Sequence, residues 1–363
     1  MTQRIAVIGA GHLGKIHARL IRQVDGAELV AVVDPSESAR QTAAEQLDVS
    51  VAADVDAILS DFDAAIIASP TPYHAATAAK LLRAGKHLLV EKPLTTGTED
   101  AFELVQLARE NRCTLQVGHV ERFNPVWTAA QEILQKPKYI EAVRASRFPG
   151  RCLDVGVVMD LMIHDIDLVL SLTDAPLRSV HASGISMVSD HEDLAEARLT
   201  FECGLVANLK ASRVSPTPSR DMQVFSESGF TAIDFGGSLT TLRPNPAILS
   251  REFQLSEETD NPMGFSDQLF SEWLPVETPE IVPRNAILDE LHDFVICCDT
   301  GATPTVSGLA GARAVQTATA VLAAIDARQW TADQTPDSVG PFATPKESIA
   351  ATSRRIHDQR RAA

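Results

Sequence analysis

The stretch Ile5-Ala-Val-Ile8-Gly9-Ala-Gly11-His-Leu-Gly14 decides the fold of the amino-terminal half of this chain. A short apolar run, suited to a buried parallel strand, leads directly into a glycine-rich turn, and residues 15–22 then have helical spacing. In this order the first glycine permits a tight turn, the second lets the backbone approach a pyrophosphate, and the third allows the helix to pack closely on the strand. The N–H groups at the start of the helix can bind the phosphates. We therefore predict a dinucleotide-binding turn made by Gly9, Gly11, His12, Leu13 and Gly14.

Asp34 ends the next predicted strand, 28–33, and lies 25 positions past Gly9. An acidic residue roughly 20 positions after the glycine turn is expected to bind the ribose hydroxyls of the dinucleotide. A carboxylate there would repel a 2′-phosphate, and the nearest basic residue, Arg40, is not adjacent, so the sequence favours NAD over NADP. The alternative is that Asp34 only caps the following helix.

A repeating strand–helix pattern continues through residue 118 and predicts a doubly wound parallel sheet. Further strands are expected at 64–68, 87–90 and 114–118, with helices at 75–84 and 98–110. Ligands of such sheets lie at the carboxyl ends of the strands. The side chains predicted there, beside the cofactor, are Ser69, Thr71, His74, Glu91 and Lys92. The alternative for His74 is that it only begins the next helix.

The second half of the chain has a different pattern. Partly alternating segments at 139–147, 179–187, 194–202, 205–212, 222–226 and 230–235 predict a large, mostly antiparallel open sheet. An apolar helix at 160–172 carries Asp160 and His164, which share one face because they are four residues apart. Helices are also expected at 285–298 and 308–328.

We predict three regions along the chain. Residues 1–122 form the cofactor domain and residues 123–330 the substrate-binding and oligomerisation domain, with helix 308–328 packing back on the first domain. Residues 331–363 are polar and proline-rich and are expected to be a mobile tail. Residues 236–285 are expected to form a long, partly irregular segment, which lies near the substrate mouth or, alternatively, is a solvated surface loop.

Lys92, Asp160 and His164 together suggest a site for hydride transfer. The cofactor performs the hard step, and the protein must orient the substrate and take up the hydroxyl proton. His164 can act as the general base, with Lys92 stabilising the developing negative charge. Alternatively, burial beside a cationic nicotinamide would make Lys92 the base. Asp160 would orient the substrate or the imidazole, or have a structural role.

Substrate-binding residues are predicted around the same three side chains. Arginine fits phosphate groups with a planar fork of donors, so arginines near the site are candidates for a sugar or its diphosphate. The predicted substrate-binding set is Lys92, Arg122, Asn124, Arg147, Arg151, Asp160 and His164. His119 and Glu121 lie in the same region, with closure of the domain boundary as an alternative role.

Composition limits the classes of function. The 363 residues are 45% hydrophobic, and 32 Lys and Arg stand against 48 Asp and Glu, a formal net charge of −16. This balance argues against a broad nucleic-acid surface. No signal peptide and no uninterrupted apolar run approaching the ~20 residues of a membrane helix is seen, so a cytoplasmic protein without a membrane partner is expected. The five scattered cysteines are interpreted as buried free thiols, and no metal site is predicted.

With these motifs the chain resembles the Gfo/Idh/MocA oxidoreductases over residues 3–330. The matching features are the glycine turn with His17, the triplet Glu91-Lys92-Pro93, and Asp160 with His164. The resemblance implies a Rossmann domain followed by an α/β domain with a large open sheet. It also implies NAD-dependent oxidation of a sugar or cyclitol hydroxyl, and a homodimer or homotetramer formed through that sheet.

A narrower likeness concerns the segments Val117-Gly-His-Val-Glu-Arg-Phe-Asn-Pro125 and Asp154-Val-Gly-Val-Val-Met-Asp-Leu-Met-Ile-His-Asp-Ile-Asp167. They are similar to the subgroup that oxidises UDP-N-acetylglucosamine at C3. This implies a 3-keto nucleotide sugar for amino-sugar biosynthesis, feeding lipid A or surface polysaccharide. The alternatives are an inositol or free monosaccharide dehydrogenase and, from another class, a noncatalytic nucleotide-sensing or scaffold protein.

Overall fold

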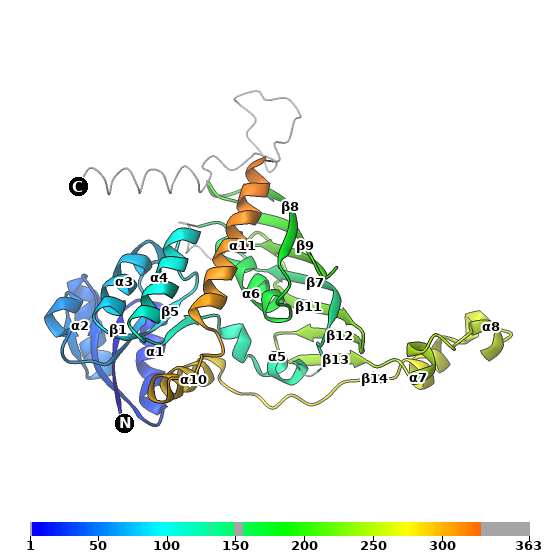
Figure 1. The fold of residues 1–363 in the computed structure, drawn as a ribbon, viewed down its shortest axis with the longest axis horizontal. Coiled ribbons are helices and arrows are strands. Elements are labelled where there is room, and N and C mark those ends of the chain that lie inside the picture. Colours follow the sequence, from blue (N-terminus) through cyan, green and yellow to red (C-terminus); the bar gives the residue numbers. More distant parts are fainter. Residues whose placement is uncertain (1, 132, 149–154, 328–363) are drawn as a thin grey trace.

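The computed structural model describes residues 2–131, 133–148 and 155–327, and these form two sheets joined by helices (Figure 1). The amino-terminal sheet lies at one end of the molecule, and the larger second sheet faces it across helix α11 (Gly308–Ala327). Arg151 and the predicted tail, 331–363, lie outside the described residues.

The first sheet is parallel throughout and has the strand order β3-β2-β1-β4-β5-β6. Its strands are β1 (Gln3–Ile8), β2 (Ala27–Val33), β3 (Ser50–Ala52), β4 (Ala64–Ile67), β5 (His87–Glu91) and β6 (Leu115–Gly118). Its helices are α1 (His12–Leu20), α2 (Glu37–Leu47), α3 (His74–Arg83) and α4 (Thr98–Glu110). All four residues of β4 are buried, and each isoleucine in it contributes about 1.5–3 kcal/mol by burial. The prediction of a doubly wound parallel sheet is confirmed.

The second sheet has the strand order β14-β13-β12-β11-β7-β10-β9-β8. Neighbouring strands are antiparallel except for the parallel pair β7 and β10, so the predicted mostly antiparallel sheet is confirmed. Its strands are β7 (Pro137–Ala145), β8 (Leu177–Ile185), β9 (Leu194–Phe201), β10 (Val206–Ser212), β11 (Ser219–Ser226), β12 (Gly229–Asp234), β13 (Ser238–Leu242) and β14 (Val276–Glu277). The inner face packs on α6 (Ile163–Ser171) and α11, whereas Val143 and Phe225 are exposed.

Helix α11 contacts both halves of the molecule. It packs against α4 and β6 of the first half and against α6 and β8 of the second. Gly308 and Gly311 bring its backbone close to β6, where an added Cβ would overlap Leu115 and Val117. By length and composition alone α11 could cross a membrane, but here ten of its residues are buried in the core. The predicted domain boundaries themselves remain predictions.

Two shorter helices pack against the sheets. Helix α5 (Pro125–Ala130) follows β6 and lies against β12 and β13. Helix α10 (Ala286–Thr300) packs against α1 and β1 of the first half.

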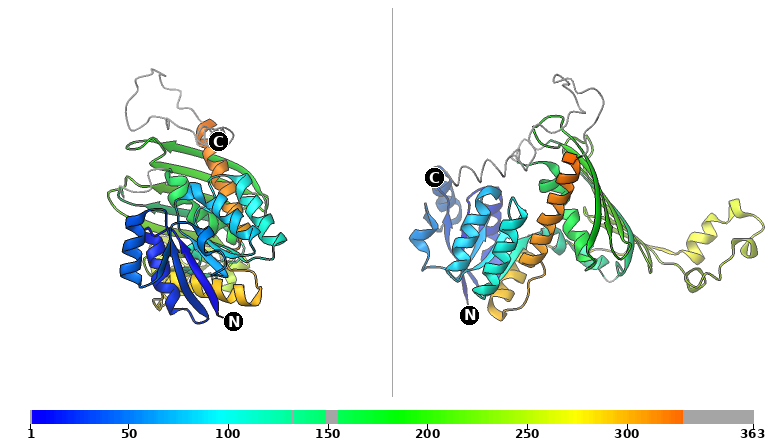
Figure 2. Two further views of the ribbon diagram at one scale, coloured as in Figure 1. Left: turned by 90° about the vertical axis from the view of Figure 1, so that its left-hand side faces the viewer. Right: turned by 45° about the horizontal axis from the view of Figure 1, so that its top comes forward.

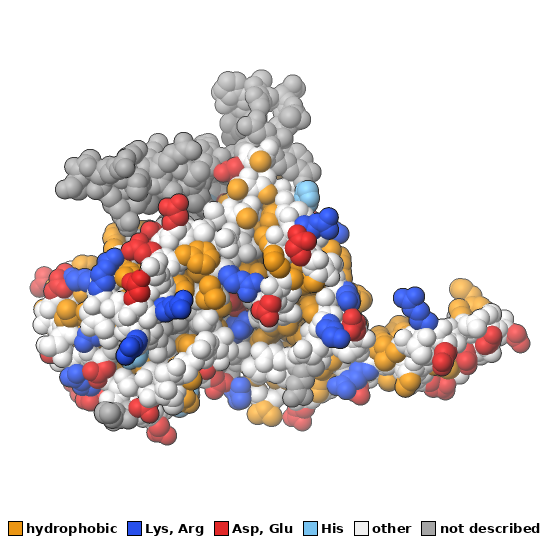
Figure 3. All heavy atoms as spheres, in the orientation of Figure 1, with side chains coloured by type: hydrophobic (Ala, Val, Ile, Leu, Met, Phe, Trp, Pro, Cys, Tyr) orange, Lys and Arg blue, Asp and Glu red, His pale blue; other side chains and the backbone are white. Residues whose placement is uncertain are grey.

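Residues 243–275, between β13 and β14, form an arm that projects from the sheet, away from the first half of the molecule (Figures 1 and 2). The arm contains α7 (Pro246–Leu249), α8 (Leu255–Glu258) and α9 (Ser266–Gln268). Phe253 lies 4.7 Å from Trp273 and 6.2 Å from Phe265 between ring centroids, giving the arm a small aromatic cluster. Carboxylates and apolar side chains share its surface (Figure 3). The arm lies away from β5 (Figure 1), which favours the surface-loop alternative for residues 243–275.

The cysteines only partly match their interpretation. Cys297 and Cys298 are buried free thiols, and burial raises the pKa of Cys297 to about 11. Cys113 is half-buried, and Cys203 is exposed because it lies in the turn between β9 and β10. Cys152 lies outside the described residues.

Candidate active site

The glycine turn has the geometry that close approach of a ligand requires. Gly9 has φ +104°, and a Cβ on it would lie 2.6 Å from the Ala68 carbonyl oxygen. A Cβ on Gly14 would overlap the Gly9 carbonyl group, so α1 can pack this closely on β1 only with glycine there. At Gly11, by contrast, a Cβ would meet no described atom within 4 Å. Gly11 caps α1 without a side-chain hydrogen bond, which leaves the backbone N–H groups of the first turn open to a pyrophosphate.

The Asp34 carboxylate lies beside this turn. It accepts hydrogen bonds from Ala10 N and Ser36 N, each at 2.8 Å. Ser36 rather than Asp34 caps α2, so the helix-capping alternative for Asp34 does not hold. Arg40 donates to the Asp34 and Pro35 carbonyl oxygens, so its guanidinium group binds the main chain rather than the Asp34 carboxylate. Each carboxylate oxygen retains a lone pair, as binding of ribose hydroxyls requires.

The loop after β4 is held by His74. Its ring nitrogens lie 2.7 Å from the Ser69 carbonyl oxygen and 3.0 Å from that of Pro93, so the buried ring joins two loops at the edge of the sheet. Burial lowers the pKa of His74. Ser69 Oγ is buried and has no partner among the described residues, whereas Thr71 begins a short 3-10 turn. Contacts of Ser69, Thr71 and His74 with the cofactor remain predictions.

Glu91 fixes the end of β5. Its Oε1 lies 2.6 Å from His17 Nε2, and its Oε2 accepts a hydrogen bond from Lys92 N at 3.2 Å. Burial pushes the pKa of Glu91 upward, but the hydrogen bond with His17 and the charge of Lys92 outweigh burial and hold this pKa below its ordinary value. Gly118 provides the space, because a Cβ there would lie 2.9 Å from Glu91 Oε2. The sequence placed His17 in the motif, and this contact gives it a role.

Lys92 and Asp160 meet across the two halves of the molecule. Lys92 Nζ donates to the Asp160 carbonyl oxygen at 2.6 Å and to Asp160 Oδ1 at 2.9 Å. Both side chains are mostly buried, with 16% and 18% exposed. The peptide bond between Lys92 and Pro93 is cis. The structure therefore brings together two of the three predicted catalytic residues.

The predicted helix at 160–172 is present, but its first residues have π-helical rather than α-helical geometry. Val158–Met162 form a π-helical turn, and α6 begins only at Ile163. A π turn inserts an extra residue into the helical pattern, and such turns occur often at functional sites. The turn presents both the carbonyl and the carboxylate of Asp160 to Lys92, which the shared-face argument for Asp160 and His164 did not foresee.

His164 lies next to His119. Their ring centroids are 6.1 Å apart, in an edge-to-face arrangement. Burial, followed by the charge of Lys92, holds the pKa of His164 well below its ordinary value. Burial likewise lowers the pKa of His119, and neither of its ring nitrogens has a partner among the described residues. His119 therefore lies beside the predicted catalytic residue His164, in addition to its place near the domain boundary.

A buried ion network beside His164 was missed by sequence reasoning. Arg144 binds Asp165 in a bidentate arrangement, with Nη2 at 2.8 Å from Oδ1, and its Nη1 lies 2.7 Å from Glu121 Oε1. The charges of Asp165 and Glu121 outweigh burial and raise the pKa of Arg144. One signal was available, because Arg144 has the same strand parity as the buried Ile140 and Ala142. A cation at an inward position requires buried partners.

The other predicted substrate residues make contacts within the protein. Arg122 donates to the Thr305 carbonyl oxygen and Arg147 to that of Pro216, both at 3.0 Å. Asn124 caps α5 and donates to Glu121 and to the Phe235 carbonyl oxygen. The unpredicted Arg220 is half-exposed and lies 3.6 Å from Glu121. Substrate contacts of these side chains remain predictions.

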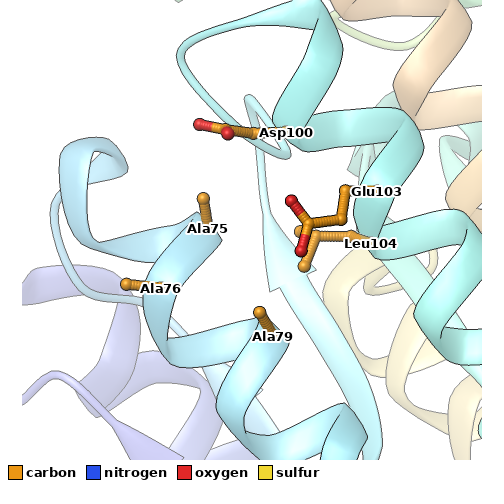
Figure 4. A pocket seen from close by; sticks show the side chains of 6 residues that line it. All are labelled: Ala75, Ala76, Ala79, Asp100, Glu103 and Leu104. Carbon is orange, nitrogen blue, oxygen red and sulfur yellow. The ribbon is translucent and has the colours of Figure 1, made fainter. Parts of the chain in front are cut away.

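A depression of about 170 Å³ between α3 and α4 is a separate feature (Figure 4). The residues that line it are Ala75, Ala76, Ala79, Asp100, Glu103 and Leu104. None of them belongs to the predicted site, and the two carboxylates would repel an anionic substrate, so this depression is not the active site. In the part of the chain that the structure describes, no group of three or more His, Cys, Asp or Glu side chains is placed to hold a metal ion.

Family models match both halves of the chain. Residues 3–119 match the oxidoreductase family with an NAD-binding Rossmann fold, and residues 137–231 match the GFO/IDH/MocA carboxy-terminal domain. The open glycine turn and the placement of Asp34 fit the NAD expected of this family.

Named relatives are similar over most of the chain. UDP-N-acetylglucosamine 3-dehydrogenase of Acidithiobacillus ferrooxidans is 34% identical over 325 residues, covering 89% of this chain and 97% of that protein. The scyllo-inositol 2-dehydrogenase (NAD(+)) of Bacillus subtilis is 31% identical over 59% of this chain and 68% of that protein.

Solved structures agree. A structure of UDP-N-acetylglucosamine 3-dehydrogenase GnnA from Acidithiobacillus ferrooxidans has a TM-score of 0.79 at 33% identity and covers 90% of this chain and 99% of that one. Scyllo-inositol dehydrogenase from Lactobacillus casei, with bound NAD(H) and scyllo-inositol, shares the fold at a TM-score of 0.71 and 22% identity, covering 90% of this chain and 98% of that one. The chain therefore belongs to the GFO/IDH/MocA family of oxidoreductases and is a dehydrogenase with an NAD-binding Rossmann fold.

Proposed function

We propose that this dehydrogenase oxidises the 3-hydroxyl of UDP-N-acetylglucosamine to a ketone with NAD. The observation that carries the proposal is the contact of Lys92 Nζ with Asp160, at the carboxyl edge of the parallel sheet and in the region of His164. The 34% identity to a UDP-N-acetylglucosamine 3-dehydrogenase over nearly its full length supports this sugar. The product would serve amino-sugar biosynthesis, for lipid A or surface polysaccharide, after transfer of an amino group.

Bound NAD would supply the hydride acceptor for the carbinol carbon. The residues proposed to hold it are the glycine turn, Asp34 at the ribose, and the loop containing Ser69 and Thr71. The carboxylate of Asp34 favours NAD because a 2′-phosphate would meet its negative charge.

Lys92 would hold the reacting oxygen. Its ammonium group has three donors, and Asp160 uses two of them, which leaves one for the substrate hydroxyl. A cation at this point stabilises the negative charge that develops on the oxygen as its proton leaves. Asp160 fixes the ammonium group by two hydrogen bonds and so sets the direction of the third.

His164 is the proposed general base. Its lowered pKa keeps the ring neutral at neutral pH, so that one nitrogen has a lone pair available for the hydroxyl proton. The charge of Lys92, which favours the neutral ring, at the same time favours the alkoxide. The two side chains therefore divide the work, with Lys92 stabilising the oxygen and His164 taking the proton.

The diphosphate would lie against arginines at the mouth of the site. Arg220 is half-exposed, and its charge acts on His164. We therefore include Arg220 among the side chains proposed to bind the diphosphate. Arg122 and Arg147 bind carbonyl oxygens through one nitrogen each, which leaves further donors on each guanidinium.

We also propose a cytoplasmic homodimer or homotetramer, formed through the outer face of the second sheet. Val143 and Phe225 on neighbouring strands are 37% and 43% exposed. Sedimentation of the protein measures its oligomeric state, and a monomer at micromolar concentration would contradict this part.

The first experiment mixes the purified protein with NAD and UDP-N-acetylglucosamine and follows NADH absorbance, with an oxidant or an aminotransferase to pull the equilibrium. Lys92→Ala should lower turnover by about 10²- to 10⁴-fold. Lys80→Ala, at an exposed position of α3, is the matched control and should retain full turnover.

The outcomes separate the alternatives. NADH formation that Lys92→Ala abolishes supports the proposal. NADH formation only with inositol or a free hexose would retain the dehydrogenase and contradict the nucleotide sugar. Binding of NAD without turnover of any of these sugars would instead favour a nucleotide sensor.

A further inference from the structure

Glu192 has no role in the site described above, yet it holds the turn that carries Asp160. It lies just before β9 and is 3% exposed. Its Oε1 accepts a hydrogen bond from Val158 N at 3.1 Å, and its carbonyl oxygen accepts one from Val157 N at 3.0 Å. The side chain and main chain of one residue therefore hold the first residues of the π-helical turn.

Gly156 makes room for this arrangement. A Cβ on Gly156 would overlap the Glu192 carboxyl group, so the close approach depends on glycine at this position. The Gly156 carbonyl oxygen also accepts a hydrogen bond from Asp160 N at 3.0 Å. A continuous set of contacts thus leads from Glu192 through the start of the turn to Asp160, and from Asp160 to Lys92 Nζ.

The charged groups around Glu192 come from two elements. Arg213, after β10, binds Asp193 at 2.7 Å and the Val155 carbonyl oxygen at 2.9 Å. Arg213 lowers the pKa of Glu192 and Asp193 raises it, but burial is the largest influence and raises it to about 7. Glu192 therefore changes its charge near neutral pH. The carboxylate form makes the stronger, charge-assisted hydrogen bond with Val158 N.

We propose that Glu192 is a positioning residue of the active site, which fixes the π-helical turn and so sets Asp160 against Lys92. The proposal rests on the roles of Lys92 and Asp160 in the proposed function. Glu192 touches neither substrate nor cofactor and acts through the main chain of Val158. Its effect is therefore expected on turnover and on the pH profile, with NAD binding unchanged.

Three variants test the proposal. Glu192→Ala should lower kcat by about 10- to 100-fold, because a displacement near 1 Å can cost this much, while the dissociation constant for NAD stays within about 2-fold. Glu192→Gln should recover kcat to within about 3-fold, because its amide oxygen can accept the same hydrogen bond. Glu103→Gln, whose side chain on α4 is 55% exposed, is the matched control and should equal the wild type.

Gly156→Ala provides a second route to the same effect. Its Cβ should push the carboxyl group from Val158 N and lower kcat as Glu192→Ala does. In the double variant Gly156→Ala/Glu192→Ala the Cβ meets no carboxyl group, so the double variant should be no slower than Glu192→Ala alone. Additive losses would show that the two residues act independently and would overturn the proposal.

The pH profile separates positioning from simple stabilisation. Because the carboxylate makes the stronger hydrogen bond, the kcat of the wild type should fall by up to about 3-fold as the pH drops through about 7, and this step should be absent from Glu192→Gln. A profile of Glu192→Gln identical to that of the wild type would overturn the proposal, as would a wild-type kcat in Glu192→Ala or an equal loss of NAD affinity.

Amide hydrogen exchange makes the test independent of turnover. Peptides spanning 156–163 should exchange faster in Glu192→Ala and Gly156→Ala, and at the wild-type rate in Glu192→Gln, while peptides from the first sheet should not change. If the wild type oxidises no sugar, the proposed function fails, whereas unchanged exchange in Glu192→Ala overturns the positioning role of Glu192.

Discussion

The glycine turn after β1 and the π-helical turn before α6 both present polar groups to the same site, but different forces hold them. Close backbone packing fixes the first, since Gly9 and Gly14 bring main chain against main chain. Buried side chains surround the second, which Glu192 holds by hydrogen bonds and beside which Arg144 joins Asp165 and Glu121. The conformation of the glycine turn is thus fixed by backbone contacts that only glycine, without a side chain, allows. The turn that carries Asp160 depends on side chains from residues far away in the chain.

The comparison is tested most strongly at Arg144. Arg144→Met leaves Asp165 and Glu121 buried without their cation, so the free energy of unfolding should fall by about 3–5 kcal/mol. Arg220→Met removes a half-exposed side chain 3.6 Å from Glu121 and should cost less than about 1 kcal/mol. Urea unfolding of both variants measures the difference. Equal losses would mean that burial does not set the strength of this network.

A smaller effect is expected in the glycine turn. Gly9→Ala places a Cβ 2.6 Å from the Ala68 carbonyl oxygen at a positive φ, so it should lower the free energy of unfolding by about 1–3 kcal/mol. The Cβ of Gly11→Ala meets no described atom within 4 Å, so this variant should leave the free energy of unfolding within about 0.5 kcal/mol, yet weaken NAD binding. Thermal unfolding with and without NAD distinguishes them. Full NAD affinity in Gly11→Ala would contradict the proposed pyrophosphate contact.

The smallest effect concerns pH. Burial lowers the pKa of both His119 and His164, so below about pH 6.5 the unfolded chain binds protons that the folded chain does not. The free energy of unfolding should therefore decrease as pH falls below 6.5, by at most about 1.4 kcal/mol per pH unit for each ring. His119→Phe should remove one ring's share of this slope between pH 5 and 6.5, whereas the exposed His181→Phe serves as control. An unchanged slope in His119→Phe would contradict the assignment.

Sequence patterns predicted the first half well because its signals are local. The glycine turn, Asp34 and Lys92 each follow an apolar strand, and the predicted strands end within one residue of the described ones. α4 begins and ends at the predicted residues. Strand β3 was missed because three residues give no usable periodicity.

In the second half the deciding contacts join residues far apart in the chain. Glu192 lies 34 positions from Val158, and Arg144 lies 21 from Asp165, distances over which no periodicity carries information. The π-helical turn is invisible to a search for 3.6-residue spacing, since it adds one residue locally. The short strands β13 and β14 were not predicted because they lie in a polar, proline-rich segment. Their strand conformation depends on pairing with the rest of the sheet.

Helix α11 has a mechanical consequence for catalysis. It packs on α4 and β6 on one side and on α6 and β8 on the other, and its glycines allow its backbone to contact β6 closely. A rotation of one sheet relative to the other would therefore disrupt the packing of α11 on both sides at once. We therefore expect the two halves to keep a fixed relative orientation rather than to open freely about a hinge. The packing of α11 is thus expected to hold Lys92 and the turn that carries Asp160 at a fixed separation.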